Sequence, residues 1–183
     1  LDPDLRPEIH PRVAGWRPLF GQAGAAQAHL AAQAVGPGDL FLFFGWFRQV
    51  EAIQGRYRYI RGAPDLHVIY GWLRVAETLD LAVRPQTMPA WTAYHPHCHR
   101  HGQGSNVLYV AAEGKAIERY DERLCLTARG RSRSMWRLPA CFAPQGRAPL
   151  SYHADPGRWG IPHNGYVTLQ TATRGQEFVL DAA

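Results

Sequence analysis

The chain has 183 residues, of which 46% are hydrophobic and 19% are charged. This balance is typical of a globular domain and excludes a disordered segment, and no apolar run is long enough for a helix that crosses a membrane. The three cysteines offer no disulfide framework and no secretory signal opens the chain, so we expect a single cytoplasmic domain over residues 1–183, without a membrane partner.

Arginine dominates the positive charge of the chain. The net charge is +5, and nineteen of the twenty basic residues are arginine, with Lys115 as the exception. A guanidinium group binds phosphate through paired hydrogen bonds and stacks on bases, which favours a nucleotide or nucleic-acid partner. A GC-rich coding bias would produce the same composition without that function, so both interpretations stay open.

The first predicted elements are a helix and a strand. Residues 1–18 are rich in proline and glycine and should be irregular. Residues 21–35 are rich in alanine, contain no proline and end at a Gly-Pro-Gly turn, which predicts a helix. Residues 39–47 are dense in aromatic side chains and predict a buried strand.

Further strands are predicted for the rest of the chain. Residues 56–60 alternate in polarity and should pair with residues 39–47 across a turn at Gln54-Gly55. Residues 66–81 predict a long strand, with a bulge or bend at Gly71. The shorter predicted strands are residues 106–111, 123–128, 166–172 and 177–181. Together these elements predict an α+β fold built on a curled, mostly antiparallel sheet or small β-barrel, with one N-terminal helix and long loops.

Histidines cluster in the segment "HPHCHRH", residues 95–101. In an extended segment alternate side chains share one face, so His95, His97, His99 and His101 would point the same way. No carboxylate follows at the spacing of a metal motif, and neighbouring His97 and Cys98 would point apart, so we assign no metal ligand. A loop role remains open. We favour His95 and His97 as acid–base groups, with Asn106 orienting the substrate.

Other polar and aromatic residues are candidates for nucleotide binding. Trp46 and Arg48 share one strand face after Gly45, where an indole and a guanidinium would hold a base and a phosphate. Asp39 follows a tight turn, so its carboxylate either binds the nucleotide or caps that turn. The complete set of nucleotide-binding candidates is Asp39, Gly45, Trp46, Arg48, Trp72, Arg174, Gln176 and Glu177. The alternatives to nucleotide binding are core packing for the aromatic strand and a charged hairpin turn for residues 174–177.

Several blocks occur in an order that resembles a known family. They are "LDPDL", "FGQAGAAQAHL", "VGPGDLFLFFGWFR", "LHVIYGWLRV", "HPH", "NVLYVA", "LSYH" and "RGQEFV". Together they resemble the third type of nucleotide modification associated domain, which is linked to DNA base hypermodification in bacterial and phage systems. The resemblance implies importance for Asp2, Asp4, Gly38, Asp39, Gly45, Phe47, Gly71, His95, His97, Asn106 and residues 174–177. It also implies that a family segment ahead of residue 1 is missing.

A second resemblance concerns the fold. The segment "PGDLFLFFG", followed by the long strand "HVIYGWLRVAETLDL", is similar to the strands of PUA-like barrels, including EVE and ASCH domains. Those domains bind RNA or modified bases on a small curled barrel. This resemblance implies a PUA-like β-barrel for the present chain.

Three functions follow from these observations. The first is an enzyme, or a component of one, that acts on a modified base or nucleotide through His95 or His97, with DNA as the favoured polymer. The second is a non-catalytic PUA-like reader, in which Trp46, Trp72 or Tyr70 stacks on a flipped base. The third is a metalloenzyme that uses the histidine cluster. The cofactor and the substrate base are not indicated by the sequence.

Overall fold

A computed structural model describes residues 2–9, 11–83, 88–100, 104–172 and 177–181. The strands are β1 (Leu19–Ala23), β2 (Leu40–Arg48), β3 (Val50–Ile53), β4 (Arg56–Tyr59), β5 (Asp65–Asp80), β6 (Asn106–Ala116), β7 (Met135–Pro139) and β8 (Tyr166–Gln170). The α-helix α1 spans Gly24–Ala32, and the short 3₁₀ helices are η1 (Ala90–Thr92), η2 (Pro96–His99), η3 (Glu122–Leu124), η4 (Ala140–Phe142) and η5 (Pro156–Arg158). Within the described ranges no helix is long and apolar enough to cross a membrane.

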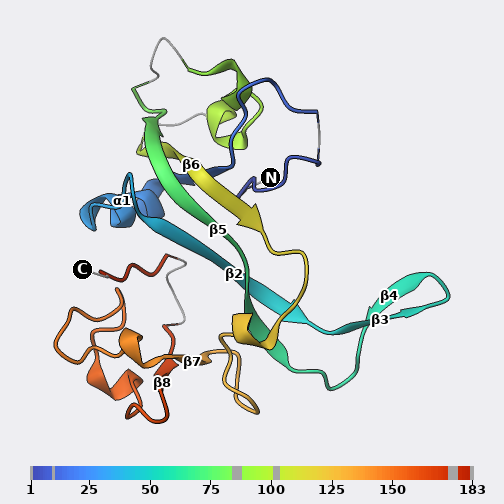
Figure 1. Cartoon of the computed structure of the whole chain (residues 1–183), viewed down its shortest axis with the longest axis vertical. Helices are drawn as coiled ribbons and strands as arrows, with labels where there is room; N and C mark the ends of the chain where they lie inside the picture. Colours follow the sequence, from blue (N-terminus) through green and yellow to red (C-terminus); the bar gives the residue numbers. More distant parts are fainter. Residues whose placement is uncertain (1, 10, 84–87, 101–103, 173–176, 182–183) are drawn as a thin grey trace. The chain divides into compact units, whose positions relative to one another are not determined.

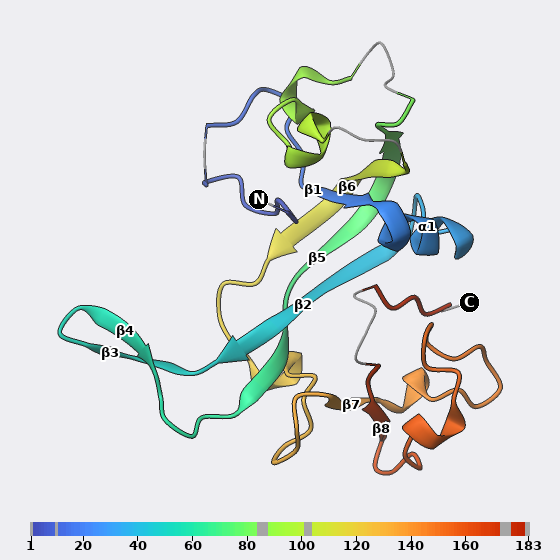
Figure 2. The same cartoon turned by 180° about the vertical axis from the view of Figure 1, so that it is seen from behind.

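The main sheet has four strands in the order β1-β6-β5-β2 (Figures 1 and 2). Strand β6 lies antiparallel to both β1 and β5. The pairing of β5 with β6 shifts register twice, between Arg74 and Val75 and between Val75 and Glu77. Such bulges increase the local twist of a strand, and they explain why the sheet curls. The predicted α+β class and the curled, mostly antiparallel sheet, consistent with a PUA-like barrel, are therefore confirmed.

The chain forms two compact units. Unit 1 comprises Leu1–Phe43 and Gly71–Glu118, and unit 2 comprises Phe44–Tyr70 and Arg119–Ala183. A core cluster of unit 1 contains Leu19, Trp91 and Val110, packed against Trp16, Leu79 and Tyr94. A core cluster of unit 2 contains Trp136, Leu138, Ala143, Leu150, Val167 and Leu169. Each unit therefore buries apolar side chains of its own.

The helix is shorter than the sequence predicts. Residues 21–23 belong to β1, where Gly21 pairs with Leu108 and Ala23 with Asn106, and α1 begins only at Gly24. Gly24 has a φ of +62°, a left-handed backbone conformation that glycine adopts without steric cost. The chain therefore turns from strand to helix at this residue. The helix prediction failed there because alanine-rich composition says nothing about the pairing partner in β6.

Several strand predictions also need correction. Strand β4 pairs with β3 in a separate hairpin and not with β2, although the turn at Gln54-Gly55 is present. Strand β2 is largely exposed where a buried strand was expected. Residues 123–128 contain part of η3 instead of a strand, because Asp121 caps a 3₁₀ turn there. Residues 177–181 form no strand. Strand β7 is absent from the sequence prediction, because it pairs with β8, which lies about 30 residues further along the chain.

Candidate functional site

The histidine segment in unit 1 is helical and not extended. Residues 96–99 form η2, and His95 is its N-cap, whose Nδ1 accepts a hydrogen bond of 3.4 Å from the backbone N–H of His97. The alternation expected for an extended segment is therefore wrong, and His95, His97 and His99 do not form a row on one face. His101 lies outside the described residues.

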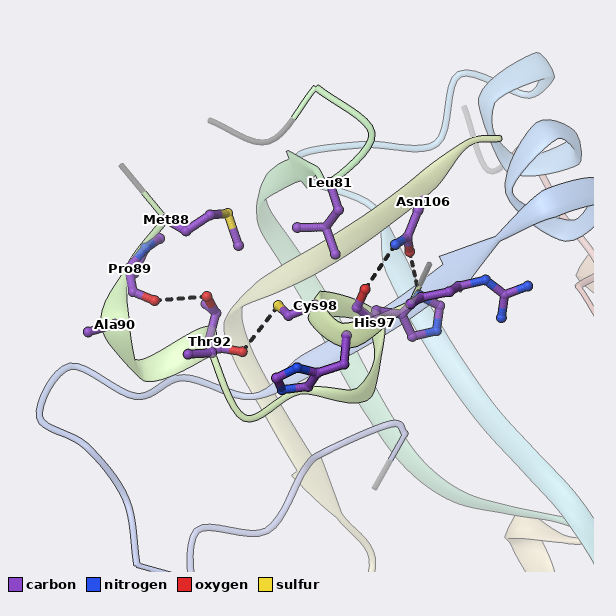
Figure 3. Close-up of a pocket in the computed structure, with 11 residues that line it drawn as sticks. Leu81, Met88, Pro89, Ala90, Thr92, His97, Cys98 and Asn106 are labelled. Carbon is purple, nitrogen blue, oxygen red and sulfur yellow. Dashed lines mark hydrogen bonds between the residues drawn. The ribbon is translucent and has the colours of Figure 1, made fainter. Parts of the chain in front are cut away.

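The imidazole of His97 lies between an amide and a carboxylate. Its Nδ1 is 2.6 Å from Oδ1 of Asn106, and its Nε2 is 3.2 Å from Oδ2 of Asp2. The Asn106 amide nitrogen donates to the backbone carbonyl of His97 at 2.9 Å (Figure 3). Because the amide nitrogen is used in this way, Oδ1 must be the atom that faces the ring, and Nδ1 of His97 must carry a proton.

The backbone of β1 provides the space for this ring. A Cβ atom at Gly21 would lie 2.4 Å from Cδ2 of His97 and 2.8 Å from its Nε2, so only glycine allows the ring to lie against the strand. The N–H of Gly21 donates to Oδ1 of Asp2 at 2.9 Å. Burial raises the pKa of the Asp2 carboxyl above its ordinary value, and this N–H and the His97 ring partly counter that rise. Gly21 thus makes room for the imidazole and helps to hold its carboxylate partner.

His95 is a fully buried imidazole beside the same carboxylate. Its side chain is 0% exposed, and its Nε2 lies 3.7 Å from Oδ1 of Asp2 without a hydrogen-bond partner among the described atoms. Burial, together with the nearby His97, lowers the pKa of His95 to about 4. The ring is therefore neutral at pH 7. Alanine at this position would leave a cavity, so that substitution is expected to lower the melting temperature.

A buried ion pair positions the backbone on both sides of this cluster. The carboxylate of Asp4 accepts two hydrogen bonds of 2.7 Å from the guanidinium of Arg12 and a third from the hydroxyl of Tyr94. Arg12 also stacks on the ring of Trp16, with its Cζ 4.1 Å from the ring centroid. Since Asp4 and Tyr94 are close in sequence to Asp2 and His95, this network orients the segments that carry the site residues.

A pocket of ≈ 320 Å³ in unit 1 adjoins the His97–Asn106 pair (Figure 3). Its lining is mixed, because it includes apolar side chains such as Leu81 and Met88 as well as the basic side chain of Arg100. The remaining lining residues are Pro89, Ala90, Thr92, Ala93, His97, Cys98, His99 and Asn106. The thiol of Cys98 donates to the carbonyl of Thr92 at 3.3 Å. The pocket therefore offers both apolar contacts and hydrogen-bonding groups.

Metal ligation by the histidine cluster is the third function that the sequence suggests. Among the residues that the structure describes, no group of three or more His, Cys, Asp or Glu side chains is arranged to hold a metal ion. The Nδ1 of His95 accepts a hydrogen bond, which places the proton of that neutral ring on Nε2, the atom nearest Asp2.

The other predicted residues that the structure describes divide between the two units. Asp39 is exposed and accepts a hydrogen bond from the N–H of Gly36 at 2.8 Å, as expected for a turn cap. Trp72 is half-buried in the part of β5 that belongs to unit 1. Gly45, Trp46 and Arg48 belong to unit 2, as does the half-buried Glu177. Arg174 and Gln176 lie outside the described residues.

Two residues of the cluster were absent from the predicted catalytic set. The sequence points to Asp2 only through the family resemblance of the "LDPDL" block, and it predicts that Gly21 belongs to the helix. The signal for Asp2 was its place in that block. No local signal identifies Gly21, because its role depends on an imidazole that is distant in the chain. Together with the predicted His95, His97 and Asn106, these two residues form the candidate site.

Comparisons with known proteins give one match. The family model described as nucleotide modification associated domain 3 matches residues 1–181, which is essentially the whole chain. No curated protein and no solved structure matches the chain. The match includes every residue of the Asp2–His97–Asn106 cluster. The chain belongs to the family described as nucleotide modification associated domain 3.

Proposed function

We propose that the chain binds a nucleotide or a single base of DNA in the pocket beside η2 and transfers a proton at His97. The family supports a nucleotide context, since its description names association with nucleotide modification. The observation that carries the proposal is the arrangement of His97 between Asp2 and Asn106 at the edge of a pocket.

The proton argument starts from Asn106. Its carbonyl oxygen keeps the proton of His97 on Nδ1, so the tautomer and the orientation of the ring are both defined. Nε2 is then the nitrogen that gains or loses a proton, and Asp2 Oδ2 is the nearest partner at 3.2 Å. An imidazole that is oriented by one group and paired with another is the usual arrangement of a general acid–base catalyst.

The lining of the pocket supports a nucleotide as the ligand. Leu81 and Met88 offer apolar contacts for the face of a base, while Arg100 and His99 offer donors for a phosphate. A volume of ≈ 320 Å³ lies at the lower end of the range for small-ligand pockets, about 300–1,000 Å³. This size favours one nucleotide, either free or flipped out of a strand.

The domain organisation, the cellular compartment and the role of His95 complete the proposal. We propose that both compact units serve one functional domain, because the family model spans both. Cys98, Cys125 and Cys141 all lie in the described part of the chain and form no disulfide, which supports a role in the reducing cytoplasm. His95 acts as a positioning residue, because its neutral ring accepts the hydrogen bond from the His97 backbone.

The test measures ligand binding and the state of His97 together. Deoxynucleoside monophosphates with each common base, and 5-hydroxymethyl-dCMP, are titrated into ¹⁵N-labelled protein while the ring nitrogens of the histidines are observed by NMR. We expect at least one nucleotide to shift the Nε2 resonance of His97. Asn106→Ala should lose the single tautomer of His97, because nothing then keeps the proton on Nδ1. His163→Ala, which removes an exposed imidazole of unit 2, is the matched control.

The same samples separate an enzyme from a reader. Mass spectrometry of the recovered nucleotides reports a change in the base, which His97→Gln should slow by at least about 10²-fold. Binding without any product would support the PUA-like reader. If none of the nucleotides shifts His97 at low salt, the pocket is not a nucleotide site and the proposal fails.

A further inference from the structure

A group of aromatic and arginine side chains lies on the surface of unit 2. We define the aromatic–arginine patch as Trp46, Arg48, Tyr57, Tyr59 and Arg133. These residues come from the end of β2, from β4 and from the loop before β7, and all of them belong to unit 2. None of them lines the His97 pocket. The patch is therefore a feature that the proposed proton-transfer site does not use.

The aromatic side chains of the patch are unusually exposed. Trp46 is 61% exposed, Tyr57 is 80% exposed and Tyr59 is 65% exposed. Soluble proteins bury most of such side chains, and clustered exposed aromatic side chains mark binding surfaces. Packing inside unit 2 therefore does not explain these three rings.

Arginine side chains lie against two of these rings. The Cζ of Arg133 is 4.0 Å from the centroid of the Trp46 ring, and the Cζ of Arg48 is 5.3 Å from that of Tyr59. Arg48 also forms an ion pair of 2.7 Å with Asp65. Hydrogen bonds from Arg48 and then from Trp46 lower the pKa of the Asp65 carboxyl. One carboxylate thus links the indole and the guanidinium, which holds both side chains in place.

The register of the β3–β4 hairpin explains the exposure of the tyrosines. Strands β3 and β4 form a two-stranded ribbon (Figures 1 and 2). Tyr57 pairs with Ala52 and Tyr59 pairs with Val50, so the two tyrosines, two residues apart, share one face of this ribbon. The methyl group of Ala52 is too small to cover a phenol ring across the strands. The hairpin therefore presents two aromatic rings, two residues apart, on one face.

The segments that carry the patch have a net positive charge. Residues 44–70 contain four arginines, namely Arg48, Arg56, Arg58 and Arg61, against two acidic residues, Glu51 and Asp65. The loop before β7 adds Arg129, Arg131 and Arg133 without an acidic residue. An aromatic surface with this charge is complementary to a polyanion that carries flat apolar groups.

We propose that the aromatic–arginine patch binds single-stranded nucleic acid, with bases stacking on the three rings and arginines contacting the phosphates. Stacking on aromatic side chains tolerates any base, because every base has an apolar face. Binding at this patch is therefore expected to show little sequence preference. It is an additional function, since it uses unit 2 and requires no catalysis at His97.

The test is fluorescence anisotropy with a labelled oligo-dT of about 12 nucleotides, with oligo-rU and a DNA duplex of the same length as the other arms. We expect Trp46→Ala and Tyr57→Ala each to weaken binding of the single strands by about 5- to 150-fold, the range measured for the loss of one stacked base. Trp46→Phe should bind single strands more tightly than Trp46→Ala, because it keeps an aromatic ring. Tyr120→Ala, which removes an exposed tyrosine of unit 2 outside the patch, is the matched control.

Salt dependence tests the role of the arginines. Arg133→Gln should lower the slope of log K against log salt by about 0.7, the value for one phosphate contact on a single strand. Three outcomes overturn the proposal. They are no binding of single strands at low salt, equal binding of duplex and single strand, or patch variants that bind within twofold of the native protein while circular dichroism shows them folded. These assays use no variant of the His97 pocket, so their failure leaves the proton-transfer proposal intact.

Discussion

The buried imidazole of His95 predicts a specific dependence of stability on pH. Its pKa is about 4 in the folded protein, against 6.5 in an exposed chain. Between these two values the unfolded chain binds a proton that the folded chain does not, so lowering the pH favours unfolding. Each pKa unit of difference corresponds to about 1.36 kcal/mol, so the lowered pKa of His95 changes the free energy of unfolding by about 3 kcal/mol. This stability is fully present above pH 6.5 and is lost as the pH falls to about 4.

The perturbation is His95→Gln, which removes the titration but keeps a polar side chain. Other buried groups also titrate, since burial lowers the pKa of His67 and of His153 and raises that of Asp2. Asp2 acts with the opposite sign, because its contribution is lost as the pH rises through its raised pKa. Both proteins retain these groups, so the difference between native and variant protein isolates His95.

The assay is urea unfolding at pH values from about 7 to about 4, with pulse-labelled hydrogen exchange on peptides of β6 as the readout. This readout reports unit 1 alone. We expect the free energy of unfolding of the native protein, relative to His95→Gln, to fall by about 3 kcal/mol across that range. His163→Gln provides the comparison for loss of an exposed imidazole. A difference that changes by less than about 1 kcal/mol would refute the reasoning, because the buried ring would then accept a proton without cost.

Two further substitutions test the environment of His97. Gly21→Ala should destabilise the protein by about 1–3 kcal/mol and change the ring resonances of His97, because the new methyl group would overlap the ring. Urea unfolding measures the loss of stability. Gly36→Ala is the control, because a Cβ atom at Gly36 would meet only a backbone oxygen at 4.0 Å. Asp4→Asn should cost about 3–5 kcal/mol, because it leaves the guanidinium of Arg12 buried without its carboxylate partner. A melting temperature of Asp4→Asn equal to that of the native protein would contradict the proposed role of this pair.

The elements that the sequence predicts correctly depend on neighbouring residues. The core of α1, the long strand β5 and the turn at Gln54-Gly55 follow from composition and alternation within a few residues. The predicted pair His95 and His97 and the predicted Asn106 lie in one cluster for a similar reason, since η2 and the start of β6 are close in the chain.

Tertiary structure decided the features that join distant segments. Asp2 meets His97 only because β1 pairs with β6, and the space for that ring exists only because Gly21 lies on the strand beside it. Residues 21–23 became strand instead of helix through the same pairing of β1 with β6. The sequence alone determined the fold class and the arginine-rich surface chemistry, because composition and local periodicity suffice for these. The contacts that assemble a site depend on sheet register and packing, which local patterns do not encode.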